Sequence, residues 1–185
     1  MDMNMDDVDS DDVKILLTDA WGISGRHDLN MTLDQLLAGQ QQNLFDELVE
    51  KNKLSRMPLS EFVMQSRVAR SLEGMNQDDY TVLVNEATSA SLRWAQDGII
   101  GWDWARYVHL LRLAFLAELL DSDESWKLLK NLEQPIKSRF KNWDSFGKSY
   151  LNGRTFWQGT ASPMDDVISR LNTDPWSPWK KFGWL

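Results

Sequence analysis

Apolar residues recur at three- and four-residue spacings in one segment after another along this 185-residue chain. In one such segment, Leu33, Leu36, Leu37 and Leu44 follow this spacing, which places their side chains on one face of an α-helix. No segment of any length alternates apolar and polar residues at period two, the pattern that would indicate a half-buried strand. The sequence therefore predicts an all-α fold.

Glycine, proline and capping signals divide this pattern into about seven to nine helices. Asn30, Ser60, Asn76 and Asp121 are suited to cap four of them, and Glu124 completes a capping-box sequence with Asp121. Pro135 is expected to bend or interrupt the helix that contains it. The expected helices span residues 11–21, 32–51, 60–72, 77–96, 101–120, 121–140, 144–157 and 164–172. The aromatic tail after them contains two prolines and three tryptophans, so we expect an irregular strap across the body of the protein.

The chain is acidic, with a net charge of -8 and a pI near 4.7. This charge repels a phosphate backbone and an anionic membrane surface, so we expect neither nucleic acid nor a membrane as a partner. A basic protein is a more compatible partner for an acidic chain. Residues 1–10 carry repelling charges and little apolar surface, which predicts a disordered acidic tail. Residues 11–185 are expected to form a single helical domain. The acidic start lacks a signal-peptide pattern, so we expect a cytoplasmic protein.

The side chains that usually carry cofactor chemistry are scarce. Cysteine is absent, which excludes disulfides, thiolate nucleophiles and cysteine-based metal sites. The two histidines, His27 and His109, have no metal-ligand spacing. No phosphate loop, dinucleotide fingerprint or nucleophile elbow is present. We therefore expect no metal and no cofactor, assign no catalytic residue, and favour a protein that is not an enzyme.

The segment from Gly101 to Leu120 is apolar on most sides, which is typical of a helix at the centre of its domain. One apolar stripe along it consists of Trp104, Val108, Leu111 and Phe115. The charged residues of such a helix need partners, because an uncompensated buried charge costs several kcal/mol.

Asp103 and Arg106 lie three residues apart in this segment and can pair on one helix face. We favour an internal salt bridge between them over a general base and an anion clamp. His109 continues the three-residue spacing of Asp103 and Arg106, and we interpret it as a hydrogen-bonded core residue.

Several short motifs together resemble the pattern of a bacterial family. They are Trp102-Asp103-x-x-Arg106 with Arg112, then Trp143, Tyr150 and Gly153-Arg154-x-x-Trp157, and finally Ser177-Pro178-Trp179. The combination resembles a bacterial domain of unknown function typified by the enterobacterial YbeU and YbeR proteins, over nearly the whole chain after residue 10. The chain departs from that pattern at Gln40 and Gln41, where the pattern has an arginine soon after Gly39. The resemblance implies the domain and no particular reaction.

Two functions remain open from these residues. The first is a non-enzymatic protein-binding module of regulatory or immunity type, because the chain is small and acidic and shows no recognisable catalytic set. The alternative is an enzyme or ligand-binding protein with an aromatic and arginine-lined pocket for a small anionic ligand. The candidate residues, for such a pocket or for a structural ion-pair cluster, are Trp102, Asp103, Arg106, Arg112, Trp143, Tyr150, Arg154 and Trp157.

Overall fold

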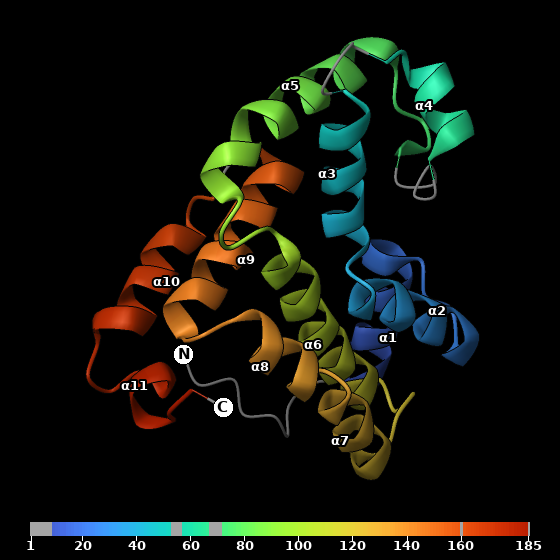
Figure 1. The fold of residues 1–185 in the computed structure, drawn as a ribbon. Coiled ribbons are helices and arrows are strands. Elements are labelled where there is room, and N and C mark those ends of the chain that lie inside the picture. The colour runs from blue at the N-terminus through green and yellow to red at the C-terminus, as the bar shows by residue number, and fades with distance from the viewer. Residues whose placement is uncertain (1–8, 53–56, 67–71, 160, 185) are drawn as a thin grey trace. The chain divides into compact units, whose positions relative to one another are not determined.

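A computed structural model describes residues 9–52, 57–66, 72–159 and 161–184 (Figure 1). Over these ranges the chain forms helices and no strand, which confirms the all-α prediction. The helices are α1 (Ser10–Trp21), α2 (Arg26–Leu37), α3 (Gln40–Lys51), α4 (Leu59–Gln65), α5 (Gln77–Trp94), α6 (Ile100–Leu116), α7 (Ser122–Lys130), α8 (Glu133–Arg139), α9 (Trp143–Gln158), α10 (Met164–Thr173) and α11 (Pro178–Lys181). None of these helices is both long and apolar enough to cross a membrane.

The chain divides into two compact units. Unit 1 contains residues 1–38 and 104–139, and unit 2 contains residues 39–103 and 140–185. Helix α6 contributes its first turn to unit 2 and its remaining turns to unit 1. The single domain expected over residues 11–185 stays a prediction. Most of the acidic tail, residues 1–8, lies outside the described residues, and Ser10 already begins α1.

The core of unit 1 is built mainly from α1, α2 and α6. The indole N–H of Trp104 donates to the carbonyl oxygen of Leu37 at 3.2 Å. The hydroxyl of Tyr107 donates to the carbonyl oxygen of Leu128 at 2.9 Å. These bonds satisfy the polar atoms of two buried aromatic side chains. The buried apolar residues of this unit are Val13, Leu17, Ile23, Leu29, Leu33, Leu36, Trp104, Tyr107, Leu110, Leu111, Leu113, Ala114, Ala117, Leu120 and Leu132.

The core of unit 2 lies among α3, α5 and α9, with α3 beside α5 and α5 beside α9 (Figure 1). Phe45 of α3 meets Phe156 of α9 edge to face, with ring centroids 5.4 Å apart. This geometry is one that aromatic pairs prefer. The main buried cluster is Leu44, Phe45, Leu48, Phe62, Leu72, Tyr80, Val84, Ala87, Ala90, Ile99 and Phe156.

Two predicted helices are each divided in the structure. The segment predicted as one helix over residues 32–51 is divided between α2 and α3, because Gly39 between them has a left-handed conformation with φ 74°. The segment predicted over residues 121–140 is divided between α7 and α8, and the break comes at Asn131. An interruption near Pro135 was predicted, and Pro135 itself lies in the first turn of α8, where its missing N–H costs no helical bond.

Of the four predicted caps, two are wrong, because Asn30 lies inside α2, which begins at Arg26, and Ser60 lies inside α4, which begins at Leu59. The other two are confirmed. The side chain of Asn76 accepts hydrogen bonds from two N–H groups in the first turn of α5. Asp121 and Glu124 form the predicted capping box at the start of α7. The helix expected over residues 60–72 is observed as α4, which ends at Gln65, and residues 67–71 lie outside the described ranges.

The C-terminal tail packs against α9 within unit 2. The ring of Trp179 stacks on Trp143 with centroids 5.3 Å apart and an interplanar angle of 11°, and Trp184 meets Trp143 edge-on at 4.8 Å. The indole of Trp184 donates to the carbonyl oxygen of Phe140, and that of Trp143 donates to the carbonyl oxygen of Phe182. The tail is thus an irregular aromatic strap, as its composition predicted.

Candidate functional site

Two of the motifs that carry the family resemblance meet in unit 2, where the first turn of α6 crosses α9. Glycines lie at this crossing. A Cβ atom on Gly153 would lie 2.3 Å from Cβ of Trp102 and 2.7 Å from the carbonyl oxygen of Ile99. A Cβ atom on Gly101 would lie 2.8 Å from the backbone nitrogen of Tyr150. The crossing therefore requires glycine at both positions, since any side chain would push the two backbones apart.

Two polar side chains of α9 fix the same crossing. The backbone N–H of Gly101 donates to the hydroxyl oxygen of the fully buried Ser149 at 2.9 Å. The side-chain amide of Asn152 donates to the carbonyl oxygen of Gly98 at 3.1 Å. The first bond satisfies an N–H group in the first turn of α6, which no preceding helical turn can satisfy, and the second satisfies a carbonyl group just before α6.

Three of the eight predicted site residues come together beside this crossing. The rings of Trp102 and Tyr150 have centroids 5.3 Å apart and an angle of 59°. The guanidinium carbon of Arg154 lies 6.0 Å from the centroid of the Trp102 ring, at the limit of a cation–π contact. Trp102 is 7% exposed. These side chains contact one another directly, which favours a packed cluster over the wall of an open pocket.

Asp103 caps helix α3. Its side chain is fully buried, and Oδ2 accepts the backbone N–H groups of Gln41 at 3.0 Å and of Gln42 at 3.2 Å. A helix cannot satisfy its first N–H groups itself, and their partial positive charge stabilises a carboxylate. The residue before α3 is Gly39, which has no side chain to make these bonds. Asp103 therefore has a structural role that explains its complete burial.

The guanidinium carbon of Arg106 lies 4.9 Å from the centroid of the Trp21 ring in unit 1. In the structure the partner of Asp103 is the start of α3, and the partner of Arg106 is the indole ring of Trp21. The salt bridge between Asp103 and Arg106 stays a prediction.

The remaining predicted residues do not join the cluster. Trp143 belongs to the strap contacts, and Trp157 on α9 is half exposed. Arg112 is exposed on α6 in unit 1. The prediction that His109 is a core residue is wrong, because its side chain is exposed, with its ring centroid 6.4 Å from that of Trp21. Partial desolvation lowers the pKa of the His109 imidazole, and the charge of Arg112 lowers this pKa further.

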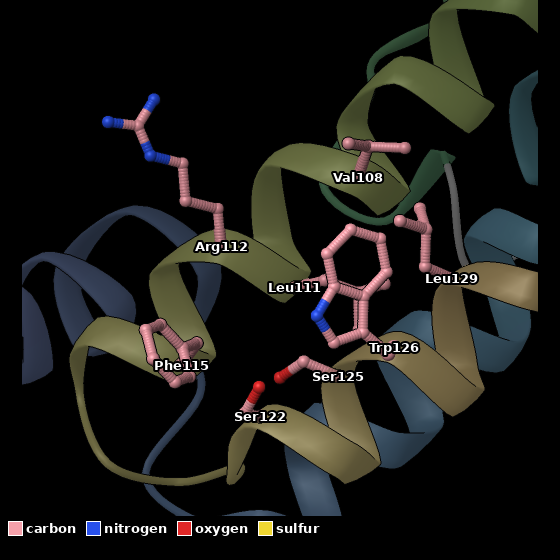
Figure 2. A pocket seen from close by; sticks show the side chains of 8 residues that line it. All are labelled: Val108, Leu111, Arg112, Phe115, Ser122, Ser125, Trp126 and Leu129. Carbon is pink, nitrogen blue, oxygen red and sulfur yellow. The ribbon is translucent and has the colours of Figure 1, made fainter.

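A hollow that the sequence did not predict lies between α6 and α7 in unit 1 (Figure 2). We call it the α6–α7 groove, and its volume is about 360 Å³. Three of its large apolar side chains are exposed: Trp126 at 61%, Val108 at 41% and Phe115 at 40%. The groove is lined by Val108, Leu111, Arg112 and Phe115 from α6 and by Ser122, Ser125, Trp126 and Leu129 from α7.

The lining of the α6–α7 groove is almost entirely hydrocarbon. Figure 2 shows the guanidinium of Arg112 pointing away from the groove. The hydroxyl of Ser125 donates to the carbonyl oxygen of Asp121 at 2.8 Å and is thereby satisfied within α7. Small-molecule sites usually combine an apolar lining with a few polar groups that orient the ligand. This groove instead suits apolar side chains.

The spacing that builds the groove was visible in the sequence. Val108, Leu111 and Phe115 follow helical spacing on α6, and Trp126 and Leu129 lie three residues apart on α7. The same spacing serves a buried core and an exposed groove. The sequence does not show which of the two applies. In the structure α7 has no fully buried residue, so its apolar face is only partly covered.

The fold and the helix crossing define an all-α protein in which two short motifs stabilise one structural junction. The family described as "Protein of unknown function (DUF1266)" matches residues 16–184, and the chain belongs to this family, which confirms the resemblance found in its motifs. A bacterial relative is the uncharacterized protein YbeR of Escherichia coli (strain K12), which is 28% identical over 101 residues. The matched region covers 50% of this chain and 42% of that relative. No solved structure matches the chain.

Proposed function

We propose that this protein is a non-enzymatic protein-binding module and that its α6–α7 groove receives a helical segment of a partner protein. The observation that carries the proposal is an apolar hollow bordered by three exposed large side chains, Trp126, Val108 and Phe115. A contiguous exposed apolar surface is typical of an interaction site. Tryptophan is also among the residues that most often dominate the energetics of protein interfaces.

A helix fits this groove because the groove lies between two helices, α6 and α7, and a third helix can pack along them. An amphipathic helix can lay its apolar face into such a groove, with anchors at positions i, i+3 or i+4, and i+7. An apolar cavity of about 150 Å³ is enough to hold benzene, so about 360 Å³ has room for two large side chains. The partner helix would thus insert two anchors one turn apart.

Trp126 alone would supply much of the binding free energy. A tryptophan buries about 150–250 Å² when it is fully covered, and 61% of Trp126 is exposed. Covering that share removes about 90–150 Å² from water, which corresponds to about 2–4 kcal/mol at about 25 cal/mol per Å². This free energy is equivalent to an affinity change of about 30-fold or more.

The test is a chemical cross-linking and co-purification experiment from the native host at physiological salt. The wild-type protein is compared with Trp126→Glu and with the control Leu92→Glu, which alters a side chain on α5 in unit 2 that is 89% exposed. We expect the same partner protein with wild type and with Leu92→Glu, and its loss with Trp126→Glu. Equal recovery with Trp126→Glu, or no specific partner with the wild type, would refute the proposal.

A further inference from the structure

A second hollow adjoins the α6–α7 groove in unit 1 and has a different chemistry. Its volume is about 500 Å³. It is lined by Ser10, Phe115, Leu116, Glu118, Leu120, Asp121 and Ser122. Phe115 and Ser122 line both hollows, so the two form one continuous surface. Glu118 and Asp121 are exposed at the second hollow, and the exposed Asp123 follows in α7. One carboxylate oxygen of Asp121 also accepts the backbone N–H of Glu124 as the cap of α7.

Figure 2 shows that Phe115 and Ser122 lie at one end of the α6–α7 groove and that Val108 and Leu129 lie at the other. The acidic hollow therefore adjoins the first of these ends. The opposite end lies beside the last turn of α7, which carries Lys127 and Lys130. Glu124 does not add to the acidic end, because its carboxylate pairs with Arg26 and closes the capping box.

We infer that the partner segment is an amphipathic helix that carries lysine or arginine at the end lying over the acidic hollow. This inference rests on the proposed function and specifies the chemistry of the partner. Glu118, Asp121 and Asp123 attract a cation at that end, where Lys14 offsets part of the charge of Glu118. Lys127 and Lys130 disfavour a cation at the other end. The segment is therefore basic at one end only, and the charges determine the direction in which it lies in the groove.

The experiment selects peptides against the whole protein from a displayed library of helical peptides. Leucine or phenylalanine is fixed at positions i and i+4, the two anchors expected in the groove, and the positions at both ends are randomised. Peptides that bind the wild type and fail to bind Trp126→Glu are sequenced. We expect them to carry lysine or arginine at one end, and a library without charge preference or with acidic ends would overturn the inference.

A charge reversal then locates the acidic end. Glu118→Lys is expected to weaken the selected peptides about 2- to 5-fold, as for an exposed ion pair. The matched control is Glu86→Lys, which makes the same charge change at an exposed position on α5 in unit 2 and should leave the affinity unchanged. If the wild type and Glu118→Lys bind the selected peptides with equal affinity, the basic end of the peptide does not lie over Glu118.

The outcomes separate this inference from the proposed function. If no selected peptide depends on Trp126, the groove itself is not a binding site and both proposals fail. If the peptides depend on Trp126 without a basic end, only the inference about charge fails. A dimer of the protein alone that is lost in Trp126→Glu would show that a second copy occupies the groove, and it would overturn the inference.

Discussion

Replacing Gly153 with alanine is expected to destabilise unit 2, although alanine is normally the better helix former. In an open helix this change stabilises by about 0.8–1.0 kcal/mol. Here the new Cβ would lie 2.3 Å from Cβ of Trp102 and 2.7 Å from the carbonyl oxygen of Ile99. Neither atom lies at the end of a flexible side chain, so only a movement of α6 away from α9 relieves the contact. Overpacking of this kind costs about 1–3 kcal/mol. A contact of 2.3 Å between two Cβ atoms cannot be accommodated without a backbone shift, which places the cost at the upper end of that range and leaves a net loss of about 2 kcal/mol.

The assay is thermal and urea-induced unfolding followed by far-UV circular dichroism. For a chain of this size, a loss of about 2 kcal/mol lowers the Tm by about 4–8 °C. Gly183→Ala is the matched control in the same unit, because a Cβ there would have no atom within 4 Å. A Gly153→Ala protein as stable as the wild type, with Gly183→Ala also unchanged, would show that the two helices do not approach closely at this crossing.

Three further substitutions test single contacts. Asp103→Ala removes the acceptor of two N–H groups at the start of α3, so the unfolding free energy should fall by about 2–4 kcal/mol. Asp103→Asn keeps an oxygen there and should lose about half as much, so equal losses in urea would contradict the cap. The pKa of His109 lies below its usual 6.5 because of partial desolvation, so the folded state disfavours protonation and stability should decrease as the pH falls below 6.5 towards that pKa. His109→Gln should remove this part of the decrease in Tm between about pH 8 and pH 5, and an unchanged profile would refute it. Trp179→Ala removes the stack on Trp143, so trypsin should cleave after Lys181 about tenfold faster, and an unchanged cleavage rate would exclude a role for the stack in holding the tail.

Local signals explain which parts of the fold could be predicted. Asn76 and Asp121 cap the helices that follow them, because a cap depends on residues within one turn. The break at Gly39 was missed for a geometric reason. Leu37 and Leu44, on either side of it, are seven residues apart, which equals about two helical turns. The apolar spacing therefore continues across a point where the helix itself ends.

The candidate site could be predicted only as a set of residues. Trp102, Tyr150 and Arg154 were identified by their motifs, but their meeting depends on two helices far apart in the chain. The partner proposed for Asp103 was Arg106, three residues away, because spacing along one helix reveals only local pairs. Its observed acceptor bonds reach back 61 and 62 residues, to Gln42 and Gln41. No pattern within a single segment indicates such a contact.

The division of roles along α6 has a consequence for mutagenesis. Its first turn holds Trp102 and Asp103, which stabilise the crossing and the start of α3. Later turns contribute Val108 and Phe115 to the α6–α7 groove. The most recognisable motif of the chain and its proposed binding surface are therefore different residues of the same helix. If a substitution of Trp102 or Asp103 abolishes partner binding and also lowers the Tm, the loss of binding is explained by lost stability. A substitution of Phe115, which is 40% exposed, has the opposite signature, because it should weaken binding while the Tm changes little.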